Sequence, residues 1–96
     1  MRLRYTAEAV AHLSSIYNFL VERNPVAARR VITRIREAAS RLREFPFIGQ
    51  KGDDPGTREW VVQGLPYLIV YEVDMLADEI VVVGVFHGAQ NRDDVS

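Results

Sequence analysis

The first half of the chain repeats its apolar residues every three or four positions, which is the spacing of amphipathic helices. The first series is Val10, Leu13, Tyr17 and Leu20. It predicts a helix with one buried side that starts after Thr6, since a threonine hydroxyl can accept a hydrogen bond from the free amides of a first helical turn.

A second helical series follows almost at once and consists of Ala28, Val31, Ile35, Ala38 and Leu42. Asn24 is the expected N-cap, and Pro25 suits the first helical position because an amide hydrogen would have no partner there. The helix should end before Pro46, since the residue ahead of a proline disfavours helical geometry. Two antiparallel helices with a tight connection are therefore expected.

The second half of the chain changes to a period of two or to continuous apolar runs. A loop rich in Gly, Pro and Asp is expected at 48–57, and β-branched and aromatic residues predict strands after it. The expected strands cover residues 2–5, 58–63, 67–73 and 79–86. Short links between the last three favour an antiparallel meander.

These elements predict one domain, residues 1–96, with an α+β fold in the order β-α-α-β-β-β. The N-terminal helical hairpin should pack on one face of a small, largely antiparallel sheet. Leu13, Leu42 and Ile69 should be buried between them, whereas the sequence leaves the position of the first strand in the sheet open.

Composition narrows the class of protein. The chain has 48% hydrophobic and 26% charged residues and no cysteine, so disorder, disulfides and thiolate metal sites are not expected. No apolar run approaches the roughly 20 residues of a membrane span, and the N-terminus lacks the apolar region of a signal peptide. We expect a soluble cytoplasmic protein without a membrane partner.

Charge is unevenly divided along the chain although the net charge is only −1. Residues 1–58 carry 11 Lys and Arg against 6 Asp and Glu, whereas residues 59–96 carry one arginine against 7 acidic residues. No cation occurs between Glu59 and Asn91. The strands therefore lack the side chains that usually hold a nucleic-acid backbone.

Common catalytic motifs are missing. The segment 49–56 has glycines without the Lys-Ser/Thr pair of a phosphate loop, and no Gly-x-Ser-x-Gly motif occurs. Only His12 and His87 are available for a triad or a metal site, and His12 should be exposed. The pairs Asp53–Asp54 and Asp93–Asp94 fit solvated loops. No cofactor and no metal site are predicted.

Four spaced motifs behind a helical hairpin carry a resemblance to a known family. They are FPFIG at 45–49, Arg58-Glu59, YLIVYEV at 67–73 and IVVVGVFHGAQNRD at 80–93. In this order they resemble the ParE branch of the RelE/ParE toxin superfamily over nearly the whole chain. The chain also looks like plasmid stabilisation toxins encoded beside an antitoxin, which implies a toxin of a type II toxin-antitoxin system.

Two activities occur in that superfamily. RelE-type members cut ribosome-bound mRNA with a basic cluster, and an arginine commonly follows the first tyrosine of the third strand. Leu68 occupies that place here, and a phosphate transition state needs preorganised cations. The resemblance therefore favours a ParE-like toxin that inhibits DNA gyrase by binding it and is not itself an enzyme.

The alternative is a RelE-like ribosome-dependent mRNA endonuclease. Some nuclease members use a glutamate, an arginine and a C-terminal histidine, which Glu59, Arg58 and His87 could imitate. Strand alternation places Arg58 and Glu59 on opposite faces of a regular sheet. The simpler interpretation of His87 is that it closes the last strand. A regulatory module without toxicity is a third possibility.

The resemblance also implies a partner, a ParD-like antitoxin with a ribbon-helix-helix DNA-binding dimer. The toxin would then be part of a hetero-oligomer and would meet DNA only through the antitoxin. The candidate antitoxin contacts are Ile16, Phe19 and Leu20, Trp60 and Tyr71 from the sheet, and the arginine series Arg29, Arg36 and Arg43. Alternatively, the apolar residues form core and the arginines a solvated face.

Overall fold

The computed structural model describes residues 1–88 and has the predicted order of elements with one short strand added. The end of the 80–93 motif and the pair Asp93–Asp94 lie outside these residues. The helices are α1 (Ala7–Val21) and α2 (Pro25–Arg41). The strands are β1 (Arg2–Tyr5), β2 (Gln50–Lys51), β3 (Thr57–Val61), β4 (Tyr67–Asp74) and β5 (Glu79–His87).

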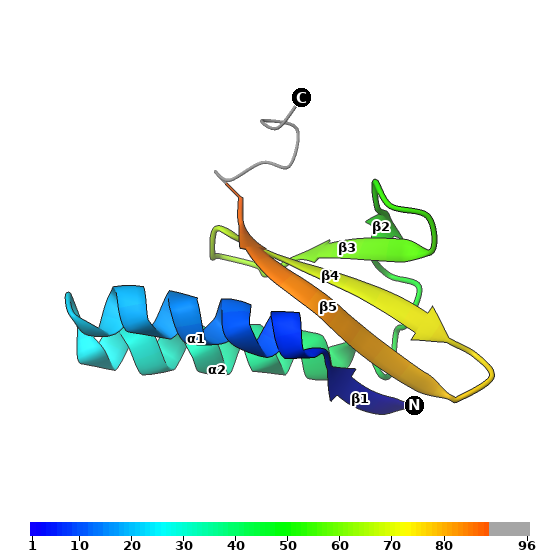
Figure 1. Ribbon diagram of the computed structural model, residues 1–96, viewed down its shortest axis with the longest axis horizontal. Coiled ribbons are helices and arrows are strands. Elements are labelled where there is room, and N and C mark those ends of the chain that lie inside the picture. Colours follow the sequence, from blue (N-terminus) through cyan, green and yellow to red (C-terminus); the bar gives the residue numbers. More distant parts are fainter. Residues whose placement is uncertain (89–96) are drawn as a thin grey trace.

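The five strands form one sheet in the order β1-β5-β4-β3-β2. Strands β3, β4 and β5 are the antiparallel meander that the short links predict. Strand β1 pairs in parallel with β5 at one edge, and β2 pairs with β3 at the other. Figure 1 shows both helices on the same side of the sheet, so the α+β prediction with a helical hairpin on one face is confirmed.

The two helices begin where the sequence indicates. The Thr6 hydroxyl accepts a hydrogen bond from the amide of Ala9 at 3.1 Å, and the Asn24 side chain accepts one from the amide of Ala27 at 3.1 Å. Helix α2 ends at Arg41, a few residues before Pro46, and residues 42–44 form turns. An end ahead of the proline is expected, since the residue before a proline disfavours helical geometry. Neither helix of the described chain has the length and apolar character that crossing a membrane requires.

The core lies between the hairpin and the sheet, and the three predicted core residues Leu13, Leu42 and Ile69 are all buried in it. The prediction for Val10 is wrong, since its side chain is 52% exposed. Ala9 takes the buried position instead. A helix turns about 100° per residue, so Val10 points sideways when Ala9 faces the sheet.

Strand β4 places both of its tyrosines on the helix side of the sheet. Tyr67, Ile69 and Tyr71 all belong to the buried cluster, and the register of β4 against β5 shifts by one residue between Val70 and Tyr71. Tyr71 is 0% exposed, with its hydroxyl hydrogen-bonded within the turn at 46–49. The expectation that Tyr71 contacts an antitoxin is therefore wrong, because its side chain is inaccessible.

Candidate functional site

A large, mainly apolar groove of about 820 Å³ lies between α1 and the end of β5. We call it the α1–β5 groove. Its lining residues come from α1, from Val31 of α2, from the β3–β4 connection, from the start of β4 and from β5; they are His12, Ser15, Ile16, Phe19, Leu20, Val31, Leu65, Pro66, Tyr67, Val85, Phe86 and His87.

The groove exists because β1 is shorter than β5. Strand β1 pairs only with residues 79–82 of β5, which leaves the edge of β5 beyond Val82 without a partner strand. Helix α1 starts directly after β1 and runs beside this edge, where the Thr6 hydroxyl donates to the carbonyl of Val83 at 3.3 Å. The residues that α1 turns toward the groove are spaced three or four apart, so they share one helix face.

His12 fixes α1 to this edge, and the prediction that it is exposed is wrong. Its Nδ1 accepts a hydrogen bond from the amide of Val85 at 3.1 Å, and its ring lies 4.9 Å from the ring of Phe86. The bond satisfies a backbone donor that an open strand edge would leave free. Because the sequence places His12 off the apolar stripe, only the pairing of β1 along half of β5 reveals its role.

Tyr67 and His87 line the groove at the end of the sheet. They are paired across β4 and β5, and their rings meet edge to face with centroids 5.3 Å apart. Burial raises the pKa of the Tyr67 hydroxyl above 10.0, so the ring is neutral at physiological pH. His87 is the last residue of β5, as its structural interpretation predicts.

The structure does not bring together Arg58, Glu59 and His87, the residues of the nuclease alternative. Arg58 pairs with Tyr71 and His87 with Tyr67, four residues away along β4, a separation of about 13 Å. Glu59 pairs with Val70, which places it on the opposite face from Arg58. The Arg58 guanidinium donates to the carbonyl of Gly49 at 2.7 Å and lies 5.0 Å over the ring of Phe47.

The predicted antitoxin contacts fall into separate regions. Ile16, Phe19 and Leu20 line the α1–β5 groove, with Phe19 58% exposed. Trp60 lies elsewhere, in a hollow between α2 and β3.

The arginine series lies on a third surface, outside the groove. Arg36 packs 5.6 Å from the ring of Tyr5, and the guanidinium of Arg43 donates to Ser40. Arg29 is exposed and lies seven residues, about two helical turns, before Arg36. The three arginines therefore do not line the surface formed by Ile16, Phe19 and Leu20.

The described residues contain no group of three or more His, Cys, Asp or Glu side chains that could hold a metal ion. The two histidines that line the groove are accompanied mainly by apolar side chains. The arrangement can hold an apolar face of a partner, and its polar groups can fix the orientation of that face.

Comparison with known proteins gives a consistent result. The family model for the ParE toxin of the type II toxin-antitoxin system, parDE, matches residues 3–92. The chain is 34% identical over 89 residues to Y4kP of Sinorhizobium fredii, covering 93% of this chain and 90% of that protein. It is 36% identical over 87 residues to toxin RelE2 of Caulobacter vibrioides, covering 90% and 93%.

Solved structures share the fold. The chromosomal ParDE system from P. aeruginosa matches with a TM-score of 0.81 at 24% identity, over 91% of this chain and 95% of that chain. The toxin-antitoxin complex RelBE2 from Mycobacterium tuberculosis matches with a TM-score of 0.64 at 21% identity, over 90% and 95%.

Proposed function

The chain belongs to the ParE toxin family of type II toxin-antitoxin systems, within the RelE/ParE superfamily, and from this premise we propose a specific action. The protein inhibits DNA gyrase by binding it, without catalysing a reaction itself, and a ParD-like antitoxin neutralises it. The observation that carries the proposal is the α1–β5 groove beside a sheet on which Arg58, Glu59 and His87 lie apart.

The groove is the proposed seat of the antitoxin. A helix that binds a groove presents apolar residues three and four positions apart, and the α1–β5 groove offers a matching apolar wall from Ile16, Phe19 and Leu20. Phe19 is exposed over more than half of its surface in the isolated chain. Covering it with a partner helix would remove apolar surface from water, which favours association.

Binding rather than RNA cleavage is supported by the chemistry of the sheet. Leu68 pairs with Phe86 at the place where nuclease members commonly carry an arginine, and Arg58 is held near Gly49, away from His87. A transition state with extra negative charge on phosphate would find no cation beside His87 on β4 or β5 within the described residues. An inhibitor that binds a protein surface has no such requirement.

The test separates the two activities with purified protein. We expect inhibition of supercoiling by gyrase and accumulation of cleaved DNA, both reversed by the antitoxin encoded beside the toxin gene, and intact mRNA in a translation extract. Codon-specific mRNA cuts that disappear in the His87→Ala variant would instead establish the nuclease. A protein that affects neither assay would fit the module without toxicity.

A further inference from the structure

A second hollow lies on the other side of the hairpin, between α2 and β3, and shares no residue with the α1–β5 groove. We call it the α2–β3 slot. Its volume is about 260 Å³, and its lining residues are Arg34, Glu37, Ala38, Arg41, Leu42, Phe45, Ile48, Trp60, Val62 and Gln63. This is below the roughly 300–1,000 Å³ of small-molecule sites, so it suits a side chain of a partner better than a free metabolite.

The apolar part of the slot is open to solvent. Phe45 is 51% exposed and Ile48 47% exposed, and Trp60 is only partly buried against the core. Leu42 and Val62 are buried beneath them. An exposed aromatic and aliphatic cluster over a well-packed floor is typical of the centre of a protein interface, where tryptophan and arginine contribute most.

Two arginines line the side of the slot formed by α2. Arg34 and Arg41 are seven residues apart, about two helical turns, and therefore share one helix face. The Arg34 guanidinium donates to the carbonyl of Gln63, which holds it against the end of β3. Among the described residues neither Arg34 nor Arg41 has a carboxylate within ion-pair distance. Both guanidinium groups can therefore donate hydrogen bonds to the carboxylates of an acidic partner.

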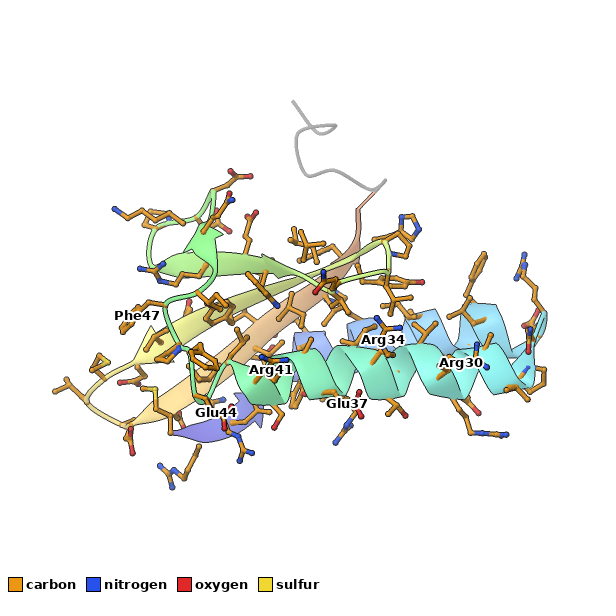
Figure 2. All side chains as sticks on the ribbon, turned by 180° about the vertical axis from the view of Figure 1, so that it is seen from behind. Arg30, Arg34, Glu37, Arg41, Glu44 and Phe47 are labelled. Atoms are coloured by element: carbon orange, nitrogen blue, oxygen red, sulfur yellow. The ribbon has the colours of Figure 1, made fainter. Side chains whose placement is uncertain are left out.

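An acidic residue, Glu37, lines the slot together with the two arginines. It is rotated about 60° from Arg34 around the helix axis, and Figure 2 shows the labelled residues Arg30, Arg34, Glu37 and Arg41 along α2, with Glu44 and Phe47 beyond its end. Carboxylates beside the arginines would repel the closely spaced phosphates of a nucleic acid. A protein segment can place its own charges to avoid them.

We propose that the α2–β3 slot is the surface by which the toxin docks on its target protein. The occupant is an acidic segment that inserts one apolar side chain between Phe45, Ile48 and Trp60 and directs carboxylates to Arg34 and Arg41. This inference rests on the proposed function, because it requires a protein target. It leaves the α1–β5 groove to the antitoxin, so the two partners contact different sides of the hairpin.

The test is charge reversal with a matched control. Arg34→Glu/Arg41→Glu changes the slot, whereas Arg29→Glu/Arg36→Glu makes the same charge change roughly 120–160° around α2. We expect the slot variant to lose toxicity, with survival after induction rising about tenfold or more. The rate at which the antitoxin dissociates from it should stay within about twofold of wild type, since the groove is untouched. The control variant should remain toxic when it is expressed without antitoxin, since Arg29 and Arg36 line neither the slot nor the groove.

Each of the other possible results would contradict a specific part of the proposal. A slot variant as toxic as wild type overturns the docking surface, and one that loses antitoxin binding while folded assigns the slot to the antitoxin. Equal loss in both double variants indicates non-specific attraction to an anionic surface such as nucleic acid. A harmless wild-type protein overturns the proposed function and the docking surface together. Arg41→Glu alone keeps the test valid if the double variant unfolds, because Arg41 is exposed and forms no ion pair with another residue of the range 1–88.

Discussion

The hydroxyl of Tyr71 accepts a hydrogen bond from the amide of Gly49 at 2.9 Å. The same hydroxyl donates to the carbonyl of Pro46 at 2.8 Å, so one buried side chain of β4 fixes the turn that follows α2. A Cβ atom at position 49 would lie 2.6 Å from this oxygen and 2.8 Å from the carbonyl of Glu59. The motifs FPFIG and YLIVYEV are thus two halves of one contact.

Replacing Tyr71 with Phe should reduce the free energy of unfolding by about 1–3 kcal/mol, because the buried amide of Gly49 and the carbonyl of Pro46 lose their shared partner. Urea denaturation measures the change. Tyr17→Phe is the control, at a half-buried ring of α1, and should change the value by less than about 0.5 kcal/mol. Equal losses in both variants would mean that the hydroxyl of Tyr71 does not stabilise the turn.

Alkaline pH should destabilise the protein through its buried tyrosines. Burial raises the pKa of Tyr5, Tyr67 and Tyr71 above the ordinary value of 10.0. Because the folded-state pKa is raised, the stabilisation is complete below about pH 10 and is lost as the pH rises through the folded-state pKa values. Urea unfolding between pH 8 and 11 should show this decline.

Tyr67→Phe provides the comparison, since it removes one titrating hydroxyl and keeps the ring that meets His87. The decline of unfolding free energy with pH should be shallower in this variant. An identical slope would show that Tyr67 is no more protected from deprotonation in the folded chain than in the unfolded one.

The central position of Leu42 can be tested by truncation. Leu42→Ala should lower the free energy of unfolding by about 2–5 kcal/mol, because the side chain is 1% exposed and its removal leaves a cavity between hairpin and sheet. Leu76→Ala is the matched control, at a fully exposed leucine in the β4–β5 turn. A loss below about 0.5 kcal/mol for Leu42→Ala would contradict the packing described for α2.

Much of the fold follows from local signals. Thr6 and Asn24 cap the helices as expected, and the strands come from segments whose apolar pattern has a period of two or is continuous. The sequence carries no signal for strand β2, because only Gln50 and Lys51 pair, inside a segment whose composition is that of a loop. It also does not indicate the position of β1, since a parallel edge strand depends on contacts far away in sequence.

The candidate site was only partly predictable for the same reason. Ile16, Phe19 and Leu20 share a helix face and therefore reach one groove. Tyr71 and Tyr67 are both tyrosines of β4, yet the hydroxyl of Tyr71 is hydrogen-bonded to the carbonyl of Pro46. The residue pattern of a single strand does not indicate this contact. His12 gains its role from the unpaired edge of β5, a property of the sheet as a whole.

The antitoxin complex offers a kinetic test of the groove. Phe19→Ala should mainly accelerate dissociation, because the exposed ring lines the α1–β5 groove and its removal takes away an apolar anchor. Surface plasmon resonance with the antitoxin gives both rate constants. Val26→Ala, at an exposed residue of α2 outside the groove, should leave dissociation unchanged. Equal acceleration in the two variants would place the antitoxin elsewhere.

The arginine series should act at a distance. Arg29, Arg36 and Arg43 are exposed and lie outside the groove, so neutralising all three to Gln should slow association and weaken its salt dependence while leaving dissociation nearly unchanged. Charge attracts an acidic partner over roughly 8–10 Å at moderate salt, whereas apolar contact holds it after docking. Both rate constants are measured at low and high salt. Association of the triple variant at the wild-type rate in low salt would show that these arginines are only a solvated face.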